Sequence, residues 1–130
     1  MILTNENYLE KAEKVIDTLS KDKKTGKTLY APKMTTTKLR KILSMVSEIY
    51  SDASRMREEK LDSEMKSRLK YLKLHIVYEE GREPVVKEFV EESNLIGALD
   101  EVEDSKSQLI IFCHYVEALV AYRKFKGNDK

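Results

Sequence analysis

The sequence predicts an all-α protein, a single-domain compact bundle of about five helices that covers residues 1–130. The length of 130 residues fits one domain. The composition is 41% hydrophobic and 36% charged, with only four Gly and two Pro, which favours long helices over strands and turns. Apolar residues also recur at steps of three and four along most of the chain, as they do on one side of an amphipathic helix.

The first helix is expected over about residues 6–20, where five apolar residues share one stripe. These are Leu9, Ala12, Val15, Ile16 and Leu19. Asn7 and Glu10 have the spacing of a capping box, which would fix the start of this helix. The polar segment 21–34 follows, and because it contains Gly26 and Pro32 we expect a flexible loop there.

The second helix is expected to begin in the run Thr35-Thr36-Thr37, because Thr favours N-cap positions. Its apolar positions form a clean amphipathic stripe. They are Leu39, Ile42, Leu43, Val46, Ile49, Tyr50, Ala53 and Met56.

The third helix is predicted over about 61–80, with Gly81 as its C-terminal stop. Its inward positions are Leu61, Met65, Leu69, Leu72 and Ile76. Pro84 suits the first turn of a fourth helical region, which covers about 84–102. That region is acidic, and a break is expected near Ser93-Asn94 or at Gly97.

The last helix is predicted over about 105–126, opening with the capping-box pattern Ser105-x-x-Gln108. It is apolar on nearly every side, which places it at the centre of the core or partly at an interface. Across the bundle we expect seven positions to be buried. They are Leu43, Val46, Leu72, Ile76, Phe112, Val116 and Leu119.

The charges are unevenly distributed along the chain. Residues 1–75 carry 17 Lys and Arg against 11 Asp and Glu, whereas residues 76–130 carry 7 against 12. Segment 79–104 alone has ten acids and two bases. This asymmetry suggests one surface for a polyanion and another for a basic partner, with ordinary surface variation as the alternative.

Basic residues accumulate on the polar sides of the second and third helices. Arg40, Lys41 and Arg55 fall away from the apolar stripe of the second helix, and Arg57 lies near its end. Lys66, Lys70 and Lys73 share one side of the third helix by their spacing, and Lys60, Arg68 and Arg82 add to this charge. Two adjacent basic helices would give a ridge suited to phosphates, although a simply solvated surface has the same pattern. Since no base-reading motif accompanies it, any nucleic-acid contact should be to backbone and shape.

Residue patterns for catalysis or metal binding are weak. Gly26-Lys27-Thr28 resembles the end of a P-loop, but Lys21 occupies the position of the required first Gly. His75, His114 and Cys113 lack the spacing of a zinc site or a nucleophilic pair, and we expect structural roles for all three. We therefore predict no enzyme activity, no metal and no cofactor.

Four tyrosines on the predicted helices could in principle stack on bases. They are Tyr71, Tyr78, Tyr115 and Tyr122. Their helical spacing beside apolar residues favours packing in the core or at an interface. The single Cys suits a reducing compartment, and neither a signal peptide nor an apolar run of about 20 residues is found, so a cytoplasmic location is expected.

Three segments resemble the small subunit of the type III-A CRISPR effector (Csm) complex, and the likeness covers most of the chain. They are Thr36-Thr37-Lys38-Leu39-Arg40-Lys41, the run from Leu69 to Arg82, and the run from Phe112 to Lys124. The resemblance implies an RNA-guided defence complex of two intertwined filaments, in which copies of this subunit form the minor filament and hold the guide–target RNA duplex. In this family the backbone subunit cuts target RNA, and the large subunit carries the nuclease or cyclic oligoadenylate chemistry.

On this resemblance, the partners expected for the chain are guide and target RNA, the backbone and large subunits, and neighbouring copies of itself. Its helix faces then nominate six RNA-binding residues. They are Arg40, Lys41, Arg55, Arg57, Lys73 and Arg82. The competing hypothesis is a helical protein–protein adaptor without RNA, in which the basic ridge contacts an acidic protein. A metal-dependent enzyme is a third class, which would require activity or bound metal in the purified protein.

Overall fold

The computed structural model describes residues 2–19 and 36–126 and confirms the all-α prediction. Six helices, rather than about five, are present in these residues. They are α1 (Tyr8–Leu19), α2 (Thr36–Ser54), α3 (Ser63–Arg82), α4 (Pro84–Ser93), α5 (Leu95–Asp100) and α6 (Lys106–Lys126). The described part of the chain contains no strand, and its β-type pairing is limited to one isolated bridge between Lys60 and Ser105. The predicted flexible loop at 21–34 and the P-loop-like tripeptide lie outside the described residues.

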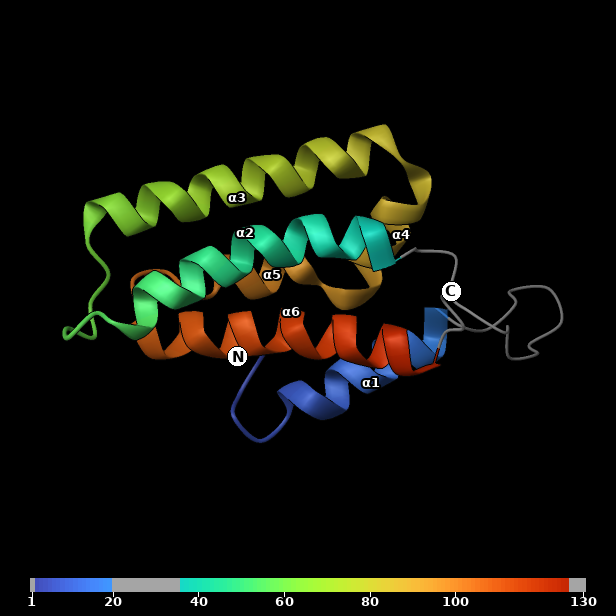
Figure 1. Ribbon diagram of the computed structural model, residues 1–130, viewed down its shortest axis with the longest axis horizontal. Helices are drawn as coiled ribbons and strands as arrows, with labels where there is room; N and C mark the ends of the chain where they lie inside the picture. The colour runs from blue at the N-terminus through green and yellow to red at the C-terminus, as the bar shows by residue number, and fades with distance from the viewer. Residues whose placement is uncertain (1, 20–35, 127–130) are drawn as a thin grey trace, which may run out of the picture.

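Helix α6 forms the centre of the bundle, and it packs mainly against α1 and α2 (Figure 1). Leu109, Phe112, Tyr115, Val116 and Leu119 are all buried along it. The hydroxyl of Tyr115 donates to the backbone oxygen of Ser93 at 2.8 Å, which ties α6 to the end of α4. The prediction of a central last helix is therefore confirmed, since α6 packs against elements on several sides.

Helices α2 and α3 run antiparallel along one side of the molecule, with α3 outermost (Figure 1). Of the seven positions predicted to be buried, six are buried and Leu43 is half-buried against the core. All five inward positions predicted for the third helix are also buried, with Leu61 just ahead of α3. The apolar periodicity thus identified which side of each helix faces inward.

Local capping explains where α3 begins and α4 ends. Asp62 is the N-cap of α3, and its carboxylate accepts from the backbone N–H of Met65 at 2.8 Å. Gly81 does not stop the helix as predicted, because α3 continues through Arg82 and the chain turns at Glu83 instead. Pro84 opens α4 as predicted, and the expected break occurs at Asn94, whose φ of 51° is left-handed.

Helix α1 begins at Tyr8, close to the predicted start, but its capping box lies three residues earlier than predicted. Thr4 N–H donates to Asn7 Oδ1 at 2.8 Å while Asn7 N–H donates to Thr4 Oγ1 at 3.2 Å, so the reciprocal box joins Thr4 and Asn7 rather than Asn7 and Glu10. Leu9, which was expected on the buried stripe, is 49% exposed. The other members of that stripe are buried or half-buried.

The N-terminal segment forms hydrogen bonds with residues about 100 positions later in the chain. The Glu101 carboxylate accepts from the backbone N–H groups of Ile2 and Leu3 at 2.7 and 2.8 Å. Gln108 donates to the Leu3 oxygen at 3.0 Å, so its side chain does not reach back to complete the predicted capping box. The other half of that box is present, because Ser105 Oγ accepts from the Gln108 N–H at 3.1 Å.

The loop between α2 and α3 is held against the first turn of α6. Glu59 accepts from the hydroxyls of Ser105 and Ser107, both at 2.7 Å, and from the Ser107 N–H. Leu61 N–H donates to the Asp104 oxygen at 2.7 Å nearby. Within the described ranges, every helix is too short or too polar to span a lipid bilayer.

Candidate nucleic-acid interface

The outer side of α2 carries cations that point away from the core. Successive residues of a helix are about 100° apart, so Arg40 lies about 150° from the centre of the buried stripe, and Arg55 follows directly after the last residue of α2. That stripe consists of Ile42, Val46, Ile49 and Ala53. Arg40, Lys41, Arg55 and Arg57 are all exposed, as the sequence predicted. Their charges are therefore available to a polyanion that approaches α2 from solvent.

These cations form two groups rather than one continuous ridge. Arg40 and Arg55 are separated by about 22 Å along the axis, at 1.5 Å per residue. Because α3 is antiparallel to α2, Arg82 lies at the same end of the helix pair as Arg40 and Lys41 (Figure 1). We call Arg40, Lys41 and Arg82 the first basic group, and Arg55 and Arg57 at the other end the second basic group.

An acid that the sequence analysis overlooked lies beside the second basic group. Asp52 accepts from Arg55 and from Arg68 of α3, each at 2.7 Å. The hydrogen bonds from Arg68 and then Arg55 lower the pKa of Asp52 below its ordinary value, so this carboxylate stays charged. It offsets part of the positive potential there, which leaves Arg57 as the member of this group without a carboxylate partner among the described residues.

Two of the six nominated residues, Lys73 and Arg82, lie on α3, and both have acidic neighbours. Lys73 donates to Asp100 at 2.9 and 3.2 Å, which directs its side chain toward α5 and away from α2. Arg82 lies 3.7 Å from a carboxylate oxygen of Glu79 one turn earlier. Lys73 is therefore not part of either basic group, although sequence spacing placed it on the same outer surface.

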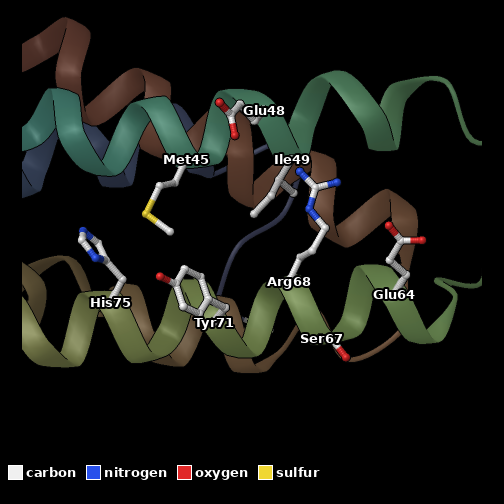
Figure 2. A pocket seen from close by; sticks show the side chains of 8 residues that line it. All are labelled: Met45, Glu48, Ile49, Glu64, Ser67, Arg68, Tyr71 and His75. Carbon is white, nitrogen blue, oxygen red and sulfur yellow. The ribbon is translucent and has the colours of Figure 1, made fainter.

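A groove of about 630 Å³ separates α2 from α3 (Figure 2). It is lined by Met45, Glu48, Ile49, Glu64, Ser67, Arg68, Tyr71 and His75. Two carboxylates and one guanidinium contribute the charge of this lining. Since Arg68 is already bonded to Asp52, the groove has no excess of cations that would hold phosphates.

The four tyrosines divide into two classes. Tyr115 is buried and Tyr122 is half-buried, as expected for packing. Tyr71 and Tyr78 are 65% and 61% exposed on the outer side of α3, which excludes the core for them and leaves packing at an interface as the prediction. The sequence signal for this was the position of both residues opposite the apolar stripe of α3.

Two of the three potentially reactive side chains, Cys113 and His114, occupy packing positions. Cys113 is buried between α6 and α2, and burial raises the pKa of its thiol to about 12, so the nucleophilic thiolate is disfavoured. His114 lies between the rings of Tyr8 and Tyr50, with centroid distances of 6.0 and 5.3 Å. His75 lines the groove between α2 and α3. Over residues 2–19 and 36–126, no three His, Cys, Asp or Glu side chains are grouped as metal ligands.

Comparison with known proteins gives a consistent family. Residues 11–129 match the family model described as Csm2 Type III-A. The CRISPR system Cms protein Csm2 of Streptococcus thermophilus is 44% identical over 127 residues, covering 98% of this chain and 97% of that protein. The protein of the same name from Mycobacterium tuberculosis (strain CDC 1551 / Oshkosh) is 38% identical, covering 96% and 95%. That of Enterococcus italicus is 36% identical over 94 residues, covering 71% and 67%.

Proposed function

Because the chain belongs to the Csm2 family of type III-A CRISPR systems, we propose that it is a non-catalytic, RNA-binding structural subunit of an RNA-guided interference complex. Copies of it form the minor filament and hold the guide–target RNA duplex through backbone contacts. Its protein partners are the backbone and large subunits of the complex and neighbouring copies of itself. Its place of action is the cytoplasm.

The observation that carries the RNA-binding proposal is the outward position of the cations on α2. Arg40 and Lys41 lie on the solvent side of the helix, and Arg57 follows its end. Among the described residues, none of these three has a carboxylate partner, so phosphates would be their first strong anionic ligands. A duplex presents phosphates at regular intervals, and contacts about 22 Å apart can be made by one stretch of backbone.

The remaining nominated cations differ in how readily they can contact RNA. Arg55 and Arg82 are exposed, and each pairs with an acid three residues earlier in the chain. Such surface pairs are worth only about 0–1 kcal/mol, so a phosphate can replace the carboxylate. Lys73 is bonded to Asp100 on another element, and RNA contact there would have to break a bond that joins α3 to α5. We therefore rank Lys73 last of the six.

Charge reversal in the assembled complex tests this proposal. Arg40→Glu with Lys41→Glu, and Arg55→Glu with Arg57→Glu, should each weaken target RNA binding while leaving the helical circular dichroism signal unchanged. The weakening should be similar for unrelated RNA sequences with matched guides, because phosphates carry no sequence information. Lys11→Glu with Lys14→Glu, two exposed positions on α1, is the matched control and should bind like wild type.

The second candidate function is a helical adaptor that does not bind RNA. The exposed apolar side chains on the outer side of α3 favour it, because they suit protein contacts and not phosphates. If the reversed variants bind RNA like wild type while the complex fails to assemble, the cations contact protein and the adaptor function is correct.

A further inference from the structure

The groove between α2 and α3 has the size and the lining of a site for a flat ligand. Its volume of about 630 Å³ lies within the range of about 300–1,000 Å³ that is usual for small-ligand sites. Tyr71 and His75 lie one turn apart on α3, so both rings are on one side of that helix, and Met45 projects toward them from α2 (Figure 2). Two aromatic rings and a thioether favour a planar, polarizable ligand.

The ring of Tyr71 is accessible to such a ligand. Tyr71 is 65% exposed although it lines the groove, whereas Met45 and His75 are half-buried and Ile49 is buried. A ligand that enters the groove would therefore cover an exposed ring and contact side chains that the fold already holds in place. Nucleobases suit this arrangement, because every base has an aromatic face and unpaired bases of RNA stack on Tyr and His side chains.

The charges around the groove repel phosphates but not bases. Glu48 and Glu64 are exposed carboxylates of the lining, and the guanidinium of Arg68 is already bonded to Asp52 at 2.7 Å. The acids therefore outnumber the guanidinium here, and opposed like charges are costly at an interface. A nucleobase is neutral, and a carboxylate can accept a hydrogen bond from the exocyclic amino group of cytosine.

The groove lies between the two basic groups of the helix pair. Lys41, of the first basic group, precedes Met45 by one turn, which places it about 6 Å away along α2 and on the same side of the helix. At the other end, Asp52 joins Arg55 of the second basic group to Arg68, which lines the groove. An RNA backbone that is held by both groups would therefore pass the opening of the groove.

We propose that the groove between α2 and α3 is a subsite for one unpaired nucleobase of the bound RNA, which stacks on Tyr71 and His75 while the two basic groups hold the flanking backbone. This inference rests on the proposed function and adds a base contact to its backbone contacts. The base has to be unpaired, because the faces of a paired base are covered by its neighbours in the duplex. Stacking tolerates every base, so the subsite is compatible with binding that ignores sequence.

Target RNA that carries 5-iodocytidine tests the base contact in the assembled complex. Ultraviolet light joins the iodinated base to an aromatic side chain that touches it, and mass spectrometry of the digested chain locates the bond. A set of target RNAs, each with one 5-iodocytidine at a different position along and beside the guide-paired segment, should give crosslinks at Tyr71 or His75. Tyr78 is 61% exposed on the same helix but does not line the groove, so it should stay free of crosslinks.

The affinity of the assembled complex for target RNA is the second arm of the experiment. Tyr71→Ala should weaken binding about five- to 150-fold, the effect of losing one stacked base. Tyr71→Phe keeps the ring and should bind like wild type, as should the matched control Tyr78→Ala. Because a base contact releases no counterions, Tyr71→Ala should also leave the salt dependence of affinity unchanged. Both tyrosines are exposed, and circular dichroism should confirm that every variant is folded.

Three results would overturn the proposal. One is a wild-type complex in which no iodinated base crosslinks to Tyr71 or His75. Another is the same RNA affinity for Tyr71→Ala and Tyr78→Ala. The third is a folded Tyr71→Ala chain that no longer joins the complex, which would make this ring a protein contact. Failure of the proposed function looks different, since Arg40→Glu with Lys41→Glu would then bind RNA like wild type whatever the result for Tyr71.

Discussion

Glu59 joins the loop between α2 and α3 to the first turn of α6 through hydrogen bonds. Its carboxylate accepts hydrogen bonds from Ser107 and Ser105, in that order of effect, and these bonds lower its pKa below the ordinary 4.5. A carboxylate with a depressed folded-state pKa stabilises the fold above its unfolded-state pKa. That contribution disappears as the pH falls through the lower, folded-state value.

We predict that Glu59→Gln lowers the melting temperature at neutral pH, because the amide replaces a charged acceptor with a weaker one. The difference from wild type should shrink as the pH falls below the ordinary value of 4.5 and through the lower, folded-state pKa of Glu59. Thermal melts across this range provide the measurement. Glu58→Gln, at the exposed neighbouring position, is the control and should melt like wild type at every pH.

Gly97 has no room for a side chain, whereas Gly81 does, and substitution of each by Ala tests this difference. A Cβ on Gly97 would lie 2.5 Å from Asn94 Oδ1 and 3.0 Å from Ile2 Cδ1, whereas a Cβ on Gly81 would meet no atom within 4 Å. Gly97→Ala should therefore destabilise the fold by about 1–3 kcal/mol through overpacking. Gly81→Ala should stabilise it by about 0.5–1 kcal/mol, since Ala is the better helix former. Denaturant titration measures both, and equal midpoints would contradict the assigned packing.

The sequence predicted a helix start or end correctly where the residues that determine it are close together in the chain. The Pro84 start and the Asn94 break were predicted, because proline and left-handed backbone act on their own neighbours. The capping box of α1 was misplaced because Thr4 and Glu10 are both acceptable partners for Asn7. The contacts that join elements, such as Arg68 with Asp52 and Lys73 with Asp100, link residues on different helices and have no signal in the pattern of one helix.

Helix α3 allows a direct test of which side faces inward. Leu72 is fully buried and Leu74, two positions later, is 62% exposed. We predict that Leu72→Ala costs about 2–5 kcal/mol of unfolding free energy, as core truncations do. Leu74→Ala should stay within about 0.5 kcal/mol of wild type. Similar denaturation midpoints for the two variants would mean that the helix is rotated from the position described.

At the scale of the whole molecule, the sequence predicted that α2 has a basic surface, but it did not predict how the cations are arranged on it. The basic character of α2 could be read from spacing, because Arg40, Lys41 and Arg55 fall off the apolar stripe. The separation into two basic groups could not, since it depends on the antiparallel arrangement of α3 and on Asp52 beside Arg55. The prediction for Tyr71 and Tyr78 did not separate the core from an interface, because it relied on their helical spacing and not on their position opposite the apolar stripe of α3.

The measurement that most directly tests the RNA-binding claim is the salt dependence of target RNA affinity for the assembled complex. Each phosphate contact contributes roughly 0.7–0.9 to the slope of log affinity against log salt. Arg40→Glu with Lys41→Glu should flatten that slope by about this amount for every phosphate that is no longer bound, summed over the copies that touch the RNA. Lys11→Glu with Lys14→Glu should leave the slope unchanged. A slope equal to that of wild type for the Arg40 and Lys41 variant, in a correctly assembled complex, would contradict the claim that these residues of α2 hold the RNA backbone.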